Sequence, residues 1–443
     1  MKTFIRVLIL SALVELSYAQ ENEIEKRLYG LPDVIFKPME TPPGFQSAYE
    51  LKVRQPIDHS DPQKGYFYQK AYLSHNGFDQ PMVFVTEGYN CYRNTVYELT
   101  KLLNANQVIV EHRYFGESCP DSLDYAYLNL KQATADLHHI NELLRNLYPD
   151  KWISTGLSKG GQTTLYYRYF YPADVDVSVP YVAPLNLEAE DQRIYGFLDT
   201  IGTDECHAAI RALQTRLLQD RNAVLPLLKF YCAGAKLQFT YLTFEEAFEY
   251  TVLEYPFSFW QWGFDCSLIP SDTASLESAL FHLLDVSDIS LFSDRDISAF
   301  APHYYQAATE MGYYGYRTEE FSGLLRALPL KPHPSAALTP GKMRVDFDGE
   351  LAAAAFNWLQ TKGDRIIYIY GGIDTWSATA VPPSEKVDAL WFFLMGQGHA
   401  GARIWNMTPE DKEKLTSALK RWLDIDISAA ENNIKLTNRQ PGL

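Results

Sequence analysis

The sequence predicts an α/β fold in which helices cover both faces of a mainly parallel sheet. A helical segment is inserted between the two parts of the chain that form this sheet domain. Short, continuous apolar runs, which suit strands buried on both faces, alternate with segments of helical periodicity. In the middle of the chain the apolar runs stop and only helical periodicity continues, before the alternation resumes near the C-terminus. A chain of 443 residues is long enough for a sheet domain with such an insertion.

The first part of the sheet domain is predicted over residues 20–186. Residues 47–58 and 65–75 alternate apolar and polar side chains around an Asp-Pro turn, which predicts an antiparallel pair of strands. Parallel strands and helices are then expected in alternation, with strands at 81–88, 106–113, 150–156 and 175–184 and helices at 127–149 and 157–172.

The insertion is predicted over residues 187–340 as a helical cap rich in aromatic side chains. The second part of the sheet domain then covers residues 341–428. Its expected elements are strands over 364–372 and 386–399 and a last helix over 408–425, with Thr408 as its N-cap. The polar residues 429–443 are expected to be poorly ordered.

Residues 1–19 have the layout of a cleavable signal peptide. Lys2 and Arg6 precede an apolar run from Val7, which is followed by Ser17, Tyr18 and Ala19, and we expect cleavage after Ala19. No later segment is long and apolar enough to span a membrane. We therefore expect a secreted or periplasmic protein.

Composition argues against several classes of partner. A net charge of −16 disfavours nucleic acid, because phosphate binding needs clustered Lys and Arg. His138 and His139 are adjacent on a predicted helix, but no metal-binding motif or Cys/His spacing accompanies them. We expect both on a solvated helix face, and we expect neither a metal ion nor an organic cofactor.

Five cysteines leave at least one thiol unpaired in a monomer, and export permits disulfides. Cys91 and Cys119 follow consecutive predicted strands, so we expect these two to pair. A second pair is expected among Cys206, Cys232 and Cys266.

The strongest functional signal is a serine at the turn between a predicted strand and a predicted helix. Ser158 is flanked by Gly156 and Gly160 in a G-x-S-x-G pattern, whose small residues allow backbones to approach closely. Asp374 follows a later strand, and His399 lies in a glycine-rich loop after the next one. Serine, acid and histidine in this order, each just beyond a strand, are the pattern of the catalytic triad in the α/β-hydrolase fold.

Each of these residues also has a simpler interpretation. Ser158 could cap a helix, His399 could be an ordinary loop residue, and Asp374 could form an Asx turn. Asp364 and Asp388 compete with Asp374 for the role of the acid. The order and setting of the three residues favour the triad.

The chemistry needs this set of groups. A serine hydroxyl is a weak nucleophile, so His399 would remove its proton during attack and return it to the leaving amine. Asp374 would orient the imidazole and stabilise its charged form. The oxyanion needs backbone donors, which we expect from the N–H of Lys159 and that of Gly88 or Tyr89. The side chain of Lys159 is expected to lie outside the chemistry.

Several segments resemble exported proline-specific serine peptidases. The segments EHRYFGES (111–118) and YLNLKQATADL (127–137) resemble the clan of lysosomal Pro-X carboxypeptidase and its dipeptidyl-peptidase relatives. The segments TEGY, STGLSKGGQT and RYFYPADVDVSVPYVAP are more similar still to secreted bacterial prolyl tri- and dipeptidyl aminopeptidases, and YYQAATEMGYYGY also resembles that clan. The resemblance runs from about residue 44 to the last helix and is loose over residues 205–300.

This resemblance implies an α/β-hydrolase core, a helical lid and cleavage after proline near a free amino terminus. It also implies that Ser158, Asp374 and His399 are the triad. The loose match in the cap leaves the length of the released peptide open. Within EHRYFGES, we expect Glu111 and Arg113 to form a buried ion pair that braces the core.

Substrate selection suggests further residues. A pocket for proline needs flat apolar walls, which aromatic side chains provide. The aromatic candidates lie in the cap or beside the expected acid: Trp260, Trp262, Tyr313, Tyr314 and Trp376. The α-ammonium group of a substrate would pair with a carboxylate in a desolvated site, for which Glu87 and Glu310 are candidates.

Two other functions remain open from the sequence. An esterase or lipase could use the same scaffold, because a fold does not fix the acyl substrate. A catalytically inactive binding protein could also keep the fold. The carboxylate-bearing cap argues against the first and the complete triad against the second. The sequence therefore predicts an exported serine exopeptidase that releases N-terminal di- or tripeptides by cleavage after proline.

Overall fold

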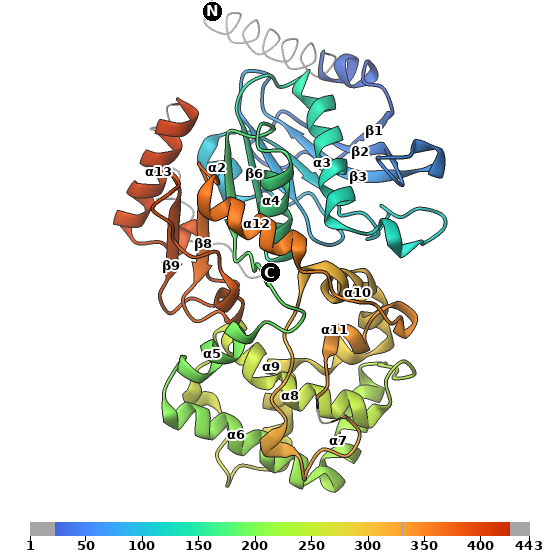
Figure 1. Cartoon of the computed structure of the whole chain (residues 1–443), viewed down its shortest axis with the longest axis vertical. Helices are drawn as coiled ribbons and strands as arrows, with labels where there is room; N and C mark the ends of the chain where they lie inside the picture. Colours follow the sequence, from blue (N-terminus) through green and yellow to red (C-terminus); the bar gives the residue numbers. More distant parts are fainter. Residues whose placement is uncertain (1–22, 330, 426–443) are drawn as a thin grey trace, which may run out of the picture.

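The computed structural model describes residues 23–329 and 331–425, and its centre is a nine-stranded sheet (Figure 1). The strand order is β1-β2-β3-β5-β4-β6-β7-β8-β9. The strands are β1 Val34–Pro38, β2 Ser47–Pro56, β3 Tyr66–His75, β4 Met82–Thr86, β5 Asn106–Val110, β6 Trp152–Leu157, β7 Val177–Tyr181, β8 Ile367–Gly371 and β9 Leu390–Leu394. The expected signal peptide at 1–19 and polar tail at 429–443 lie outside the described residues.

The sheet is antiparallel at one side and parallel over the rest. β1, β2 and β3 pair antiparallel, and β3 pairs antiparallel with β5. From β5 to β9 all neighbours are parallel. The predicted antiparallel pair and the predicted parallel strands are thus confirmed. This mixed sheet with helices on both faces is the α/β-hydrolase fold predicted from the sequence.

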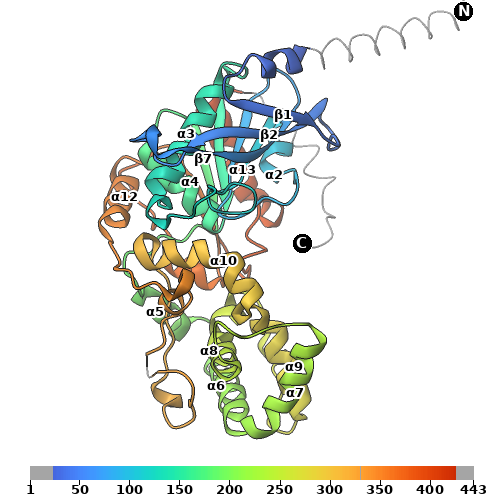
Figure 2. The same cartoon turned by 90° about the vertical axis from the view of Figure 1, so that its right-hand side faces the viewer.

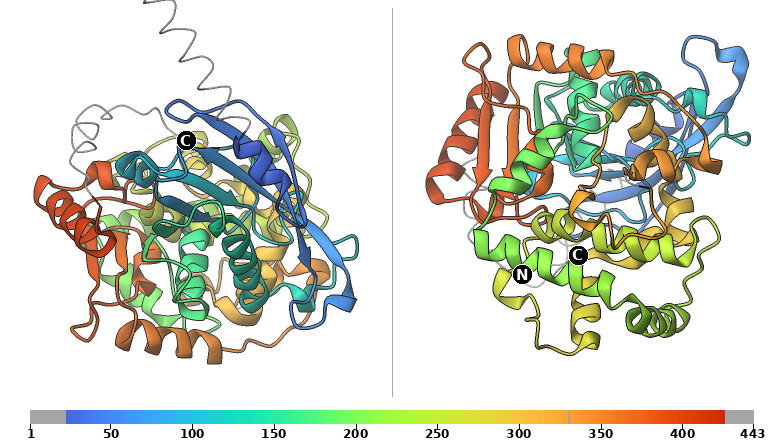
Figure 3. Two further views of the ribbon diagram at one scale, coloured as in Figure 1. Left: turned by 90° about the horizontal axis from the view of Figure 1, so that it is seen from above. Right: turned by 60° about the horizontal axis from the view of Figure 1, so that its bottom comes forward.

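Helices cover both faces of the sheet (Figures 2 and 3). Val83 and Val85 of β4 contact the core beneath α2 and α13, whereas Phe84 contacts the core beneath α3. Burial on both faces explains why β4 reads as a continuous apolar run. The helices are α2 Glu98–Leu103, α3 Leu130–Arg145, α4 Lys159–Phe170, α12 Glu350–Thr361 and α13 Pro409–Leu423. The Thr408 side chain caps α13 by accepting from the N–H of Asp411, as predicted.

The helices between β7 and α12 lie beyond one edge of the sheet (Figure 1). They are α5 Gln192–Thr200, α6 Asp204–Gln219, α7 Arg221–Gly234, α8 Phe244–Trp262, α9 Leu276–Ser287, α10 Asp294–Gln306 and α11 Pro334–Ala337. We call this segment the cap. It meets the carboxyl ends of the strands: the hydroxyl of Thr375, after β8, donates to Phe257 O (2.8 Å). The N–H of His399, after β9, donates to Gln261 O (2.7 Å).

The longest helix of the cap, α8, has clear start and stop signals. Thr243 and Glu246 form a reciprocal capping box at its first turn. The helix ends at Gly263, whose φ of 75° is a left-handed conformation that glycine adopts without strain. The side chains between these ends are mostly buried, and they form the centre of the cap core.

The cysteine pairing differs from the prediction. Cys206 and Cys266 form a disulfide that joins the start of α6 to the segment after α8, with a Cα–Cα distance of 5.4 Å. Cys91 and Cys119 are both free, as is Cys232. The predicted Cys91–Cys119 pair is therefore wrong. The second predicted pair, among the three remaining cysteines, is present.

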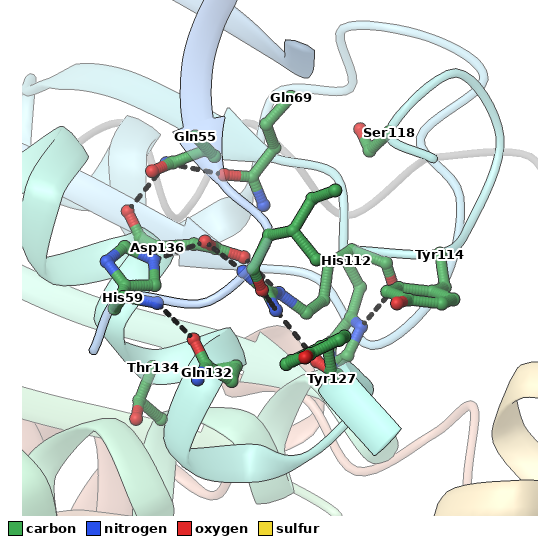
Figure 4. A network of polar contacts seen from close by, with 12 residues as sticks. Gln55, His59, Gln69, His112, Tyr114, Ser118, Tyr127, Gln132, Thr134 and Asp136 are labelled. Carbon is green, nitrogen blue, oxygen red and sulfur yellow. Dashed lines mark hydrogen bonds and ion pairs between the residues drawn. The ribbon is translucent and has the colours of Figure 1, made fainter. Parts of the chain in front are cut away.

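Glu111 and Arg113 are both buried in ion pairs, but not with each other. Arg113 Nε lies 2.7 Å from Asp136 Oδ2, and Glu111 Oε2 lies 3.1 Å from Lys70 Nζ. Each residue therefore braces a different part of the core. Figure 4 shows Asp136 in a wider network that also includes His59, at 2.7 Å.

The two adjacent histidines are not free on a solvated face. His138 Nδ1 lies 2.7 Å from Asp174 Oδ2, and its ring stacks on Tyr171 with the centroids 4.1 Å apart. His139 Nδ1 lies 2.9 Å from Gln55 Oε1. Within residues 23–329 and 331–425, no group of three or more His, Cys, Asp and Glu side chains could hold a metal ion.

Candidate active site

Ser158 sits on a strained turn between β6 and α4. Its φ of 56° and ψ of −122° are rare for a residue with a side chain. Glycines make the turn possible: a Cβ at Gly156 would lie 2.3 Å from Gly160 O, and one at Gly160 would lie 2.6 Å from Thr86 O. The turn presents Ser158 at the carboxyl end of β6, as the G-x-S-x-G pattern predicts.

Asp374 and His399 are joined by a hydrogen bond. Asp374 Oδ2 lies 2.7 Å from His399 Nδ1, and both side chains are buried. The other carboxylate oxygen accepts from the N–H of Trp376 (3.1 Å), so Asp374 is an Asx-turn residue as well as the partner of His399. With Nδ1 on the carboxylate, Nε2 is left to face a reacting group.

The sheet brings Ser158 to the same edge as this pair. β6, β7, β8 and β9 are parallel neighbours in that order, and the three residues follow β6, β8 and β9. The Ser158 hydroxyl and His399 make no hydrogen bond to each other within the described part of the chain. In ligand-free hydrolases this bond is often long, and it tightens when the substrate binds.

The competing acids lie at the opposite edge. Asp364 precedes β8 and accepts from the N–H of Asp388, which itself precedes β9. Asp388 also accepts from Arg421 and from the indole N–H of Trp422. Neither residue is near the carboxyl ends of the strands, so only Asp374 is placed to pair with His399.

The loop that carries His399 is braced from α2. Glu98 accepts from the N–H of Ile404 (2.8 Å) and of Trp405 (3.2 Å). Arg403 is buried and donates to His399 O (3.1 Å). These contacts fix the backbone that follows the imidazole.

The predicted oxyanion donors lie close to the serine. A Cβ on Gly88 would fall 2.6 Å from both Gly160 N and Lys159 Cβ, so the loop after β4 rests directly on the start of α4. In the described ranges, the N–H groups of Gly88, Tyr89 and Lys159 donate to no protein acceptor. Unused donors that converge beside a serine are what an oxyanion hole requires.

Aromatic side chains gather next to the Asp374 turn. Trp376 meets Phe257 of α8 edge to face, with ring centroids 5.1 Å apart, and contacts Tyr313 and Tyr314 at 5.6 and 5.5 Å. Trp262, which is half exposed, lies 6.0 Å from the ring of His399. Trp260 is instead buried in the cap core.

The two predicted carboxylates are already engaged in hydrogen bonds. Glu87 accepts from the hydroxyl of Tyr97 (2.6 Å), and burial raises its pKa. Glu310 accepts from the N–H of Leu130 (2.8 Å) at the start of α3, which ties the cap to the sheet domain. Burial raises the pKa of Glu310 to about 7.

A third carboxylate, Glu254 of α8, was not predicted from the sequence. It is buried beside the aromatic group and accepts from the hydroxyls of Tyr316 (2.7 Å), Tyr314 (2.9 Å) and Ser258 (2.8 Å). Burial raises its pKa to about 7. The available signal was an acidic residue inside an otherwise apolar helical stretch, because such a residue is buried and needs partners.

One known protein is similar to this chain over nearly its whole length, and a second is similar over about a quarter of it. The prolyl tri/tetrapeptidyl aminopeptidase of Streptomyces mobaraensis is 28% identical over 424 residues, which cover 94% of this chain and 88% of that protein. The serine protease vicPb of Bipolaris victoriae (strain FI3) is 33% identical over 144 residues, or 27% of each chain.

Two solved structures are more distant. The proline iminopeptidase of Mycobacterium smegmatis has 10% identity and a TM-score of 0.38, covering 84% of this chain and 97% of its own. A proline iminopeptidase-related protein of Thermus thermophilus has 14% identity and a TM-score of 0.36, covering 85% and 99%. Likenesses this distant say nothing about substrate.

The family model gives a more direct result. The model described as PS-10 peptidase S37 matches residues 19–439, which is almost the entire chain. Such a match covers the sheet domain and the cap together. The chain therefore belongs to the PS-10 peptidase S37 family and is a serine peptidase.

Proposed function

We propose that this peptidase is exported and releases short peptides from free amino termini by cleavage after proline, with Ser158, His399 and Asp374 as its triad. The observation that carries the proposal is the 2.7 Å hydrogen bond between His399 and Asp374 at the sheet edge where Ser158 occupies its strained turn. The relative from Streptomyces, named as a prolyl tri/tetrapeptidyl aminopeptidase, supports the substrate class.

In the proposed mechanism, the Ser158 hydroxyl attacks the carbonyl carbon of the proline residue while Nε2 of His399 takes its proton. Asp374 stabilises the imidazolium without accepting the proton. The N–H of Lys159 and that of Gly88 or Tyr89 bind the oxyanion. His399 then protonates the leaving amine, which departs and leaves an acyl-enzyme. Water, activated by His399, hydrolyses the ester and frees Ser158.

The aromatic group beside Asp374 supports the preference for proline. A proline side chain offers an apolar ring and its nitrogen carries no N–H, so it suits flat apolar walls without polar partners. Trp376 and Tyr313 are proposed as walls of this pocket, and Trp262 as a wall on the side of His399. Trp376 belongs to the Asp374 turn and contacts Tyr313, and Trp262 contacts the ring of His399.

The preference for a free amino terminus would come from a carboxylate. Glu87 and Glu310 remain our candidates, and Glu254 joins them because it lies against the same aromatic residues. A charged ammonium in a desolvated site is stable only when it is paired. Glu87 follows β4, Glu254 lies in α8 and Glu310 follows α10. The carboxylate that pairs with the ammonium would therefore determine how many substrate residues fit between it and Ser158.

Export is supported by the disulfide. The bond between Cys206 and Cys266 persists in an oxidising environment and is uncommon in the reducing cytosol. The sequence of residues 1–19 has the features of a signal peptide. None of the helices in residues 23–329 and 331–425 is long and apolar enough to cross a membrane.

The test compares chromogenic amides of Ala-Pro, Ala-Ala-Pro and Ala-Ala-Ala-Pro, each with a free and a blocked amino terminus. We expect rapid hydrolysis of the free forms, little of the blocked forms, and almost none by Ser158→Ala. The tripeptide amide is expected to be best, since tripeptide release is shared by our prediction and the name of the relative. Ala-Ala-Ala amide is the matched control for proline.

Three outcomes would contradict parts of this proposal. Equal rates for free and blocked substrates would exclude an ammonium anchor. Hydrolysis of Ala-Ala-Ala amide as fast as Ala-Ala-Pro amide would exclude a proline pocket. Full activity of Ser158→Ala would exclude the triad. The carboxylate that pairs with the substrate ammonium is then identified with the variants Glu87→Gln, Glu310→Gln and Glu254→Gln. It is the residue whose replacement raises KM only for substrates with a free amino terminus.

A further inference from the structure

The side chain of Lys159 is buried directly beside the proposed nucleophile. Only 3% of the residue is exposed. Its Nζ lies 4.6 Å from the centroid of the Phe115 ring and 5.3 Å from that of Tyr89. In the described part of the chain, no carboxylate lies within 4.0 Å of this ammonium group. A buried ammonium without a close counter-ion is costly, so its position calls for an explanation.

The hydrogen bond of this ammonium group explains its buried position. Lys159 Nζ donates to Gly88 O at 2.6 Å. The carbonyl of Gly88 and the N–H of Tyr89 belong to one planar trans peptide, in which they point in opposite directions. A clamp on the Gly88 carbonyl therefore fixes where the Tyr89 N–H points.

The neighbouring peptides are held as well. Tyr89 O accepts from the N–H of His112 (3.0 Å), and the N–H of Cys91 donates to Glu111 Oε2 (2.8 Å). Hydrogen bonds from the segment EHRYFGES thus hold the loop after β4 on one side, and the hydrogen bond from Lys159 holds it on the other. The Tyr89 N–H is left without a protein acceptor in the described ranges.

The backbone of Gly88 is packed against the start of α4. A Cβ built on Gly160 would lie 3.3 Å from Gly88 N, and the Gly88 Cα packs against the Lys159–Gly160 peptide. This contact places the start of α4 over Gly88. Of the two candidates for the second oxyanion donor, Gly88 is therefore the one that packs against α4, which favours the N–H of Tyr89.

We infer that Lys159 is a positioning residue: its ammonium group clamps the Gly88 carbonyl so that the Tyr89 N–H is the second donor of the oxyanion hole. A hydrogen bond donated to the carbonyl oxygen also polarises the peptide and strengthens its N–H as a donor. This inference differs from the expectation that the Lys159 side chain lies outside the chemistry. The inference rests on the proposed triad and adds a residue that acts through the backbone.

The test is Lys159→Met, which keeps the length of the side chain and removes the donor. We expect kcat for Ala-Ala-Pro amide to fall by about 10- to 100-fold, somewhat less than for outright loss of a donor, with KM changed by less than about twofold. Inhibition by a free-amino peptidyl-proline boronate, whose tetrahedral adduct places an oxygen in the oxyanion hole, should weaken by the same factor. Lys159→Arg, which keeps a cationic donor, should recover much of the loss.

The matched control is Arg168→Met in the same helix. Arg168 is also a buried cation that donates to backbone carbonyls, those of Val175 and Asp364, but it lies at the far end of α4. This variant is expected to lower stability and to leave kcat and boronate inhibition unchanged. Thermal unfolding of both variants separates loss of fold from loss of catalysis, and Lys159→Gln replaces the methionine variant if that one does not fold.

An unchanged kcat in Lys159→Met would overturn the inference. So would a loss confined to KM, or a fall in kcat without weaker boronate inhibition. None of these results would affect the proposed triad, which fails only if Ser158→Ala remains active. The two hypotheses are therefore tested separately.

Discussion

The sheet domain and the cap hold the residues of the proposed site in different ways. At the sheet edge the backbone sets each position: Ser158, Asp374 and His399 follow strand ends, and the glycine contacts near Ser158 are so short that no side chain fits. In the cap, positions depend on side chains that contact other side chains, as in the three hydroxyls around Glu254.

This difference separates chemistry from selectivity. A site made of backbone geometry can tolerate few changes, whereas a site made of side-chain contacts can change its pocket while the fold is kept. Damage to the sheet edge should therefore abolish turnover, and damage to the cap should change which substrates are used. The following four predictions test this division.

The largest effect is expected for Asp374→Asn, which removes the charge that stabilises the imidazolium. We expect kcat to fall by about 10⁴-fold with little change in the unfolding temperature. Steady-state kinetics on Ala-Ala-Pro amide provides the measurement. Asp364→Asn, at the opposite edge of the sheet, is the matched control and should stay within about twofold of the wild type. Equal losses in both variants would remove Asp374 from the triad.

The second prediction concerns the cap alone. The double variant Cys206→Ala/Cys266→Ala should lower the free energy of unfolding by about 2–4 kcal/mol in denaturant titrations. We expect KM for peptide amides to rise, while hydrolysis of a small ester such as p-nitrophenyl acetate is kept. Cys119→Ser, at a free cysteine of the sheet domain, should change neither quantity. Parallel loss of ester and peptide turnover would show that the cap and the triad are not separable.

The third prediction tests the backbone contacts of the sheet edge. An alanine Cβ at Gly160 would lie 2.6 Å from Thr86 O, so Gly160→Ala should cost about 1–3 kcal/mol of stability and also reduce kcat. Gly234→Ala is the matched control, since a Cβ there meets no atom within 4 Å. Chemical denaturation and kinetics of both variants give the answer, and equal stability of the two would refute the close contact.

The smallest effect is expected for the pH dependence of cap stability. Burial raises the pKa of Glu254 from 4.5 to about 7, so between these values the folded state holds a proton that the unfolded state has released. Stability contributed by the protonated form is therefore lost as the pH rises through this window. Glu254→Gln should reduce the fall in unfolding free energy between pH 5 and pH 7 by about 1–2 kcal/mol. An unaltered pH dependence would mean that the carboxyl group is already ionised at pH 5.

The sequence was most informative where structure depends on local pattern. Buried strands read as apolar runs, and the G-x-S-x-G turn marks a strand-to-helix junction because only glycine fits its contacts. The order of strands then places Asp374 and His399 at one edge, since parallel strands end on the same side. These features need no knowledge of distant side chains.

Pairings between distant segments could not be predicted in this way. Cys91 and Cys119 follow neighbouring strands, yet the N–H of Cys91 is held by Glu111 and the Sγ of Cys119 faces Gly116 O. The partner of Cys206 depends on how α6 packs against α8, which no periodicity reveals. The three hydroxyls that satisfy Glu254 likewise come together only in the folded cap.

The disulfide of the cap has one more consequence. It closes a loop whose ends are 60 residues apart in the chain and which contains α7, α8 and most of α6. A single cut of the backbone anywhere inside this loop would leave the two fragments covalently attached. A nicked molecule would thus keep both parts of its cap attached to each other, so the pocket could re-form.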